Sequence, residues 1–164
     1  MEELKRKAIM LSLIEKMDKK GSWNGETHIQ KVVYFLEQLL KVPLGYGFVL
    51  YKHGPYSFDL HDELIEMKAN NLLDLKNNYP YGSSYEAGTL AETLKIRFPK
   101  TIGMYDNALG FITEKIANRK VVDLEKLATA LYVISKEHCI EDRACAERIN
   151  CLKPHINIEQ AKEA

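Results

Sequence analysis

The side chains best suited to acid–base chemistry lie in the segment Tyr51-Lys52-His53-Gly54-Pro55-Tyr56-Ser57. The imidazole of His53 titrates near neutral pH and stands directly before a Gly-Pro turn, where it could donate or accept a proton. No sequence signature of a serine or cysteine nucleophile accompanies it. We therefore expect His53 to form structural hydrogen bonds, and an enzyme that uses His53 stays an alternative.

A second group of reactive side chains lies near the C-terminus and contains His138, Cys139, Cys145, Cys151 and His155. Zinc sites favour ligand pairs two to four residues apart. The cysteines here are six residues apart, which places successive thiols about 240° apart around a straight helix. We predict no metal and no cofactor, and we keep a metal-binding protein built on residues 139–151 as an alternative. The odd number of cysteines also makes a disulfide framework improbable.

A run of carboxylates marks the helix that is predicted to begin after Ser57. Asp59, Asp62, Glu63 and Glu66 recur at i, i+3, i+4 and i+7, so one outward face would carry all four. A helix that reads DNA presents cations and amides to the groove, and phosphates would repel these acids. The pattern indicates a solvated helix surface or a binding site for a basic protein.

Hydrophobic periodicity predicts the elements that position these residues. We expect helices over residues 3–17, 26–40, 57–70, 101–118, from Asp123 onward and 140–152, with Asn157 capping a last turn. Ser57 and Asp123 are predicted N-caps. Residues 48–51, 72–76 and 84–87 are predicted strands, and the last two form a hairpin with Tyr79 and Tyr81 at its tip. The stretch 89–99 is ambiguous, and we favour a helix that Thr89 caps and Pro99 ends.

The predicted order of helix, helix, strand, helix and hairpin is that of a winged helix-turn-helix. We therefore predict a mainly helical α+β fold and a single domain. Its winged-helix-like core would span residues 1–88, and a helical cap would span residues 89–164. A chain of 164 residues is long enough to bury one core.

Composition limits the partners and the compartment. Lys plus Arg and Asp plus Glu each total 23, so no whole-protein field attracts nucleic acid or an anionic membrane. No apolar run approaches the roughly 20 residues of a membrane helix, and the N-terminus lacks the apolar stretch of a signal peptide. We expect a cytoplasmic protein with no membrane partner, and a homodimer stays open. A DNA-binding regulator stays an alternative, with a basic patch of Lys95, Arg97, Lys100, Lys115, Arg119 and Lys120.

Three segments together resemble a known family. They are His28-Ile29-Gln30-Lys31-Val32-Val33-Tyr34-Phe35-Leu36, then Tyr51 to Ser57 with Leu60, and Asp123-Leu124-Glu125-Lys126-Leu127-Ala128-Thr129. The chain resembles the YwgA-type uncharacterised proteins of bacteria and archaea over most of its length. Over about residues 26–75 it is more distantly similar to the Panacea, or SocA-like, antitoxin domain. That resemblance implies an antitoxin or degradation adaptor that acts by binding a partner protein.

Our prediction is a non-enzymatic, partner-binding protein with no catalytic residue. The resemblance implies contacts near Lys31, Tyr34, Tyr51, His53, Tyr56 and Ser57. The acidic helix adds Asp59, Asp62, Glu63 and Glu66, and the hairpin tip adds Tyr79 and Tyr81. Aromatic side chains at a hairpin tip suit a protein contact or base stacking.

Overall fold

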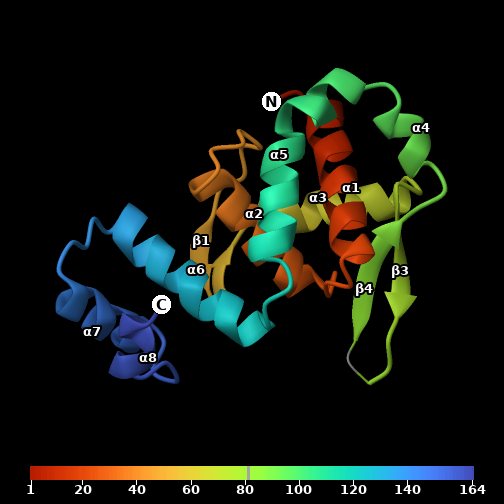
Figure 1. Cartoon of the computed structure of the whole chain (residues 1–164). Coiled ribbons are helices and arrows are strands. Elements are labelled where there is room, and N and C mark those ends of the chain that lie inside the picture. The colour runs from red at the N-terminus through yellow and green to blue at the C-terminus, as the bar shows by residue number, and fades with distance from the viewer. Residues whose placement is uncertain (81) are drawn as a thin grey trace.

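The computed structural model describes residues 1–80 and 82–164 (Figure 1). The described chain contains eight helices and four short strands, which confirms the mainly helical α+β class. In chain order they are α1 (Glu3–Lys19), α2 (Glu26–Gln38), β1 (Val49–Tyr51), β2 (Gly54–Tyr56), α3 (Phe58–Ala69), β3 (Leu73–Asn77), β4 (Ser83–Ala87), α4 (Ala91–Lys95), α5 (Pro99–Lys115), α6 (Val121–Lys136), α7 (Asp142–Leu152) and α8 (Ile158–Lys162). None of the helices in the described residues is both long enough and apolar enough to cross a membrane.

Helices α1 and α2 form the centre of the main hydrophobic core. Residues 7–14 of α1 are buried on every side of the helix, and so are residues 28–36 of α2. A helix that is apolar nearly all round must be surrounded by other elements. Helices α4 and α5 pack against α1, while α6 packs against α2, and Figure 1 shows α1 and α5 side by side. The two helices that are buried on every side therefore lie at the centre, and the other helices pack around them.

The C-terminal helices form a second, smaller core. It is built from buried side chains of α6, α7, α8 and the segment between the last two, namely Ala130, Val133, Cys145, Ala146, Ile149, Ile156 and Ala161. Figure 1 shows α7 and α8 to one side of the molecule, beside the C-terminal half of α6. Helix α6 thus contributes to both cores, because Leu124 and Ala128 belong to the main one.

The four strands form two separate antiparallel hairpins. Strand β1 pairs with β2 in the register Val49 to Tyr56 and Tyr51 to Gly54, and β3 pairs with β4. The predicted turn at Gly54 is therefore the first residue of a strand, and its φ of +85° suits a glycine after a two-residue loop. The predicted order of elements is otherwise found. Strand β1, however, does not join the β3–β4 hairpin as the first strand of a winged helix would.

Two of the four predicted helix caps are present in the structure. Ser57 caps α3 as expected, because its hydroxyl accepts a hydrogen bond from the Leu60 amide at 3.2 Å. Asn157 caps α8 in a capping box. The caps predicted at Thr89 and Asp123 are wrong, since α4 and α6 begin without a side-chain cap and Asp123 lies inside the first turn of α6. A polar residue near a helix start is favourable without being the cap itself.

Replacing Ser57 with alanine should lower the free energy of unfolding by about 1 kcal/mol, because the Leu60 amide would lose its acceptor. Ser57 is fully buried, so water cannot replace the hydroxyl. Urea denaturation measures the change. The matched control is Thr89→Ala, which removes the hydroxyl at the wrongly predicted cap and should change stability by less than about 0.5 kcal/mol. Equal losses in the two variants would contradict the capping role.

A disulfide framework is improbable from the odd number of cysteines, but two of the three cysteines do form a disulfide. Cys139 and Cys145 are joined by a disulfide, with their Cα atoms 5.6 Å apart. The 240° spacing that was applied to a metal site assumes one straight helix, but α7 begins only at Asp142, so Cys139 lies in the non-helical segment before the helix. Cys151 is free and exposed.

Candidate protein-binding surface

Three aromatic rings meet where the β1–β2 hairpin joins α3. Tyr51 comes from β1, Tyr56 from β2 and Phe58 from the first position of α3. Their ring centroids lie 5.6 Å apart for Tyr51 and Tyr56, 5.7 Å for Tyr51 and Phe58, and 5.2 Å for Tyr56 and Phe58. These are the spacings and tilted geometries that aromatic pairs prefer. Tyr51 is still 55% exposed and Phe58 53% exposed, so this aromatic triad presents ring surface to solvent.

Carboxylates surround the aromatic triad. Glu26 of α2 accepts hydrogen bonds from the Tyr56 hydroxyl at 2.9 Å and from His61 Nδ1 at 2.7 Å. Burial, together with the Glu26 carboxylate, raises the pKa of Tyr56, so the phenol stays protonated and keeps donating. Asp59 and Asp62 lie on the same end of α3 and are exposed. In the described chain, no Lys or Arg forms an ion pair with either aspartate.

The four acids of α3 do not form one outward face. Glu63 is only 5% exposed, and its carboxylate is bonded to the Arg6 guanidinium and to the Tyr46 hydroxyl. Glu66 is exposed but pairs with Lys7 at 2.6 Å. The prediction that all four acids point outward is therefore wrong for Glu63, and Lys7 neutralises Glu66. The positions that face α1 are paired because α1 contributes cations at Arg6 and Lys7.

Two buried side chains of α2 form hydrogen bonds with the backbone of β2 and of Ser57. The Gln30 amide donates to the Ser57 carbonyl and accepts from the Ser57 amide, both at 2.9 Å. The Lys31 ammonium donates to the Pro55 carbonyl at 2.9 Å. Burial lowers the pKa of Lys31 to about 8, although the nearby Glu125 carboxylate opposes that change. These bonds tie the second strand and the start of α3 to the central helix.

A second anchor reaches the hairpin from the C-terminal part of the chain. Lys153, buried after α7, donates to the Tyr51 carbonyl at 2.6 Å and also to the Lys52 carbonyl. The buried Glu125 carboxylate lies 3.6 Å from the Lys153 ammonium, 3.3 Å from His155 Nε2 and 3.8 Å from His53 Nδ1. Glu125 therefore balances the charge of the cations beneath the β1–β2 loop.

The structure separates the predicted contact residues into exposed and buried groups. Tyr51, His53, Tyr56, Asp59, Asp62 and Glu66 have side chains that reach the surface at or near the hairpin and α3. Lys31, Tyr34, Ser57 and Glu63 are buried and can act on a partner only through the residues that they hold in place. Tyr79 is 91% exposed, but it belongs to the β3–β4 hairpin, which Figure 1 places on the opposite side of α1 from β1. Tyr81 lies outside the described residues.

Sequence reasoning missed several residues of this surface. Phe58 was not singled out, although an aromatic residue directly after the Ser57 cap is a local signal for an exposed position at a helix start. Glu26 and Lys153 carried no such signal, because they approach the hairpin from distant parts of the chain. Glu125 lies in the segment Asp123 to Thr129, but its partners His53, Lys153 and His155 could not be predicted, because they are distant from it in the chain.

His53 does not form a catalytic arrangement in the described residues. Its imidazole faces Glu125 at 3.8 Å, and it makes no hydrogen bond to a hydroxyl or thiol there. Across the described ranges 1–80 and 82–164, no group of three or more His, Cys, Asp or Glu side chains is placed to hold a metal ion.

The basic patch of the DNA-binding alternative is partly neutralised. Lys95 forms ion pairs with Glu15 at 2.6 Å and with Glu92 at 2.8 Å. Lys115 pairs with Glu114 at 3.3 Å. Cations that already have acidic partners bind phosphate less strongly.

No protein-family model matches the sequence, and no curated protein is significantly similar to it.

Proposed function

We propose that this protein is a non-enzymatic protein-binding module whose contact surface is the β1–β2 hairpin with the start of α3. The observation that carries the proposal is the exposed aromatic triad of Tyr51, Tyr56 and Phe58, bordered by carboxylates. Tyrosine and other aromatic residues supply much of the binding energy in protein interfaces because they combine large area with few rotatable bonds.

The partner should present basic and apolar side chains together. The faces of aromatic rings attract arginine and lysine through the ring quadrupole. Asp59 and Asp62 add negative charge that no cation of the described chain neutralises. Ile65, 50% exposed, follows Asp62 by three residues and extends the apolar part of the same helix face. An arginine-containing segment with an aliphatic neighbour fits this surface best.

The surface is also held in a fixed conformation. Lys31, Gln30 and Lys153 bond to backbone atoms of the hairpin and of Ser57, the N-cap of α3. A loop that is already ordered loses less conformational freedom when a partner binds. The buried part of the predicted contact set therefore supports binding indirectly, by keeping the three rings in place.

An antitoxin-like or adaptor-like role is consistent with this surface. In the family that the sequence distantly resembles, the protein acts by contacting and neutralising or delivering another protein. The product of the adjacent gene is the first partner to test.

Replacing Phe58 with serine should weaken partner binding by tenfold or more, because the loss of a central aromatic anchor costs about 2 kcal/mol in typical interfaces. Asp62→Lys should weaken it by a similar factor if the partner is basic. A photo-crosslinking residue at position 58 identifies the contacted protein in cells, and calorimetry with the purified pair then measures the affinity.

Met104→Ser is the matched control, since Met104 is 73% exposed on α5 and its loss removes a comparable apolar group elsewhere. It should leave the affinity unchanged. Circular dichroism verifies that all three variants are folded. Unchanged binding by Phe58→Ser, or an equal loss with Met104→Ser, would place the contact on another surface.

A further inference from the structure

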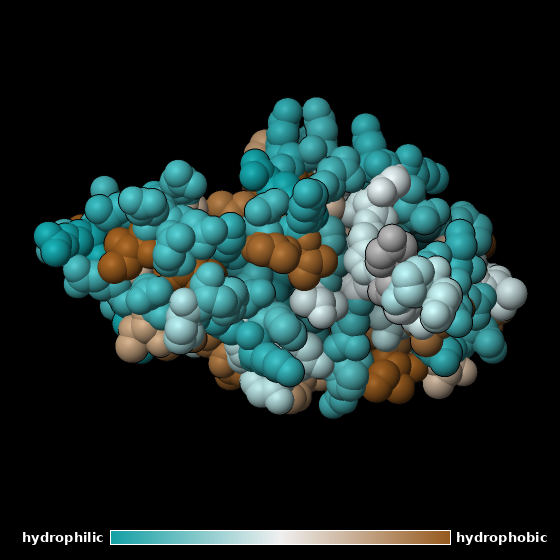
Figure 2. Space-filling model, turned by 90° about the horizontal axis from the view of Figure 1, so that it is seen from below, coloured by the Kyte–Doolittle hydropathy of each residue, from teal (hydrophilic) through white to brown (hydrophobic). Residues whose placement is uncertain are grey.

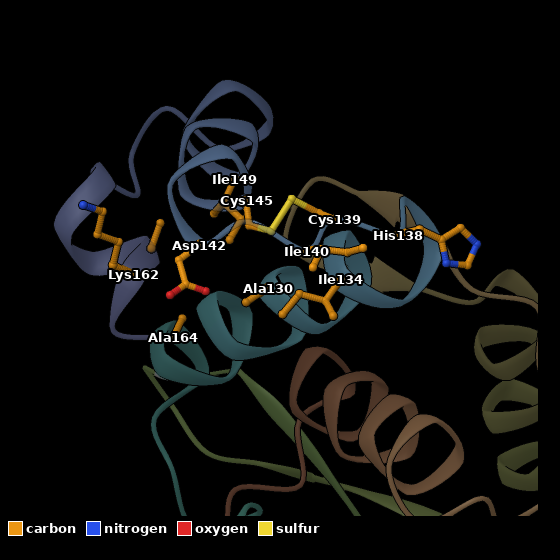
Figure 3. A pocket seen from close by; sticks show the side chains of 11 residues that line it. Ala130, Ile134, His138, Cys139, Ile140, Asp142, Cys145, Ile149, Lys162 and Ala164 are labelled. Carbon is orange, nitrogen blue, oxygen red and sulfur yellow. A yellow bond between two sulfur atoms is a disulfide. The ribbon is translucent and has the colours of Figure 1, made fainter.

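A hollow lies in the C-terminal core, away from the aromatic triad. It has a volume of about 570 Å³ and lies between α6, α7 and α8. Sites for small ligands in proteins commonly enclose about 300–1,000 Å³. Figure 3 shows Ala130 and Ile134 of α6 along one side of the hollow, so we refer to it as the α6 groove.

The walls of the α6 groove are apolar. Ala130 and Ile134 of α6 form one wall, and Ile149 of α7 contributes to the other. The Cys139–Cys145 disulfide closes the upper side, as Figure 3 shows. The bond also ties the segment that carries Ile140 to α7, which fixes that rim relative to the helix.

Two isoleucines at the α6 groove are left uncovered. Ile134 is 53% exposed and Ile140 is 94% exposed. Large aliphatic side chains gathered at a concave surface mark binding sites more often than ordinary solvated surface. In Figure 2 the part of the surface formed by the C-terminal helices, on the left, carries apolar groups among hydrophilic neighbours. An apolar ligand would bury the two isoleucines.

One carboxylate gives the α6 groove a polar end. Figure 3 shows the Asp142 carboxylate pointing into the space between α7 and α6, at the opposite end of the groove from His138. Asp142 makes no ion pair or side-chain hydrogen bond in the described residues. The ammonium of Lys162, which also borders the hollow, is directed away from that carboxylate in the same view. The acid is therefore available to a cation.

From these features we infer that the α6 groove binds an amphipathic cation, an alkyl chain that ends in an ammonium group. The alkyl chain lies along Ile134 and Ile140, and the ammonium pairs with Asp142. An anionic amphiphile of the same length is disfavoured, because its carboxylate would meet Asp142. This site is independent of the proposed protein-binding surface.

Isoleucine δ1-methyl NMR tests the inference directly. Octylammonium, titrated into protein labelled at these methyls, should shift the Ile134 and Ile140 signals in a saturable manner. Its affinity should exceed that of octanol by about threefold, the worth of a solvent-exposed ion pair, because Asp142 is exposed. Octanoate should bind more weakly than octanol. In Asp142→Asn the preference for octylammonium over octanol should disappear, while octanol binds as it does to the wild type.

Octanol serves as the internal control, because unchanged octanol binding shows that the groove of Asp142→Asn is intact. Asp74→Asn, which removes an exposed acid on β3, should keep the full preference. The inference is overturned if octylammonium produces no saturable shift at Ile134 and Ile140. It is also overturned if octanoate binds as tightly as octylammonium, or if Asp142→Asn retains the preference.

Discussion

Arg6→Ala should lower the free energy of unfolding by about 3 kcal/mol, the cost of leaving one member of a buried ion pair without its partner. The Glu63 side chain is 4% exposed, and its carboxylate is bonded to the Arg6 guanidinium. Among the described residues, the Tyr46 hydroxyl, at 2.8 Å, would be the one remaining donor to this acid. Denaturant unfolding at pH 7 measures the loss.

Lys5→Ala is the control on the same helix. Lys5 pairs with Glu2 at 2.9 Å, but both side chains are largely exposed, and such pairs contribute less than about 1 kcal/mol. A second variant separates lost charge from lost packing. Adding Glu63→Gln to Arg6→Ala should restore part of the stability, because the amide removes the unpaired charge. A loss below about 1 kcal/mol in Arg6→Ala would contradict the burial of this pair.

The free energy of unfolding of the wild type should increase by about 2 kcal/mol more than that of Lys31→Met when the pH is raised from 7 to 9.5. Burial lowers the pKa of Lys31 to about 8 in the folded protein, against 10.5 for an unperturbed lysine. Between these values the unfolded chain binds a proton that the folded protein has released. Stability therefore increases with pH in this window, and below pH 8 both states carry the charge.

Denaturant unfolding at several pH values measures the difference between the two curves. Groups other than Lys31 titrate in both proteins, so their effects cancel. Lys68→Met replaces an exposed lysine of α3, and its curve should run parallel to that of the wild type. Parallel curves for wild type and Lys31→Met would show that Lys31 titrates normally. The hydrogen bond from Lys31 to the Pro55 carbonyl makes this titration relevant to the hairpin that carries the aromatic triad.

Both predictions concern residues, Glu63 and Lys31, whose burial and partners come from distant parts of the chain. The spacing of Glu63 with Asp59, Asp62 and Glu66 is that of residues on one helix face. Part of that face, however, packs against α1 and is not exposed to solvent. Helix periodicity places Glu63 beside buried Leu60 and Leu64 as readily as beside Asp62. The pairing of Glu63 depends on Arg6 of α1, which lies 57 residues earlier in the chain.

The amino-acid sequence by itself determined the local elements of this protein. Apolar spacing in α1, α2, α3 and α5 and the capping side chains of Ser57 and Asn157 act within one or two turns, so they can be predicted from neighbours in the chain. Tertiary structure alone decided the pairing of β1 with β2, the meeting of Tyr51, Tyr56 and Phe58, and the Cys139–Cys145 bond. It also brought Glu125 and Lys153 beneath the hairpin. Such contacts depend on how whole elements pack, and packing energy is shared among many residues that lie far apart along the chain.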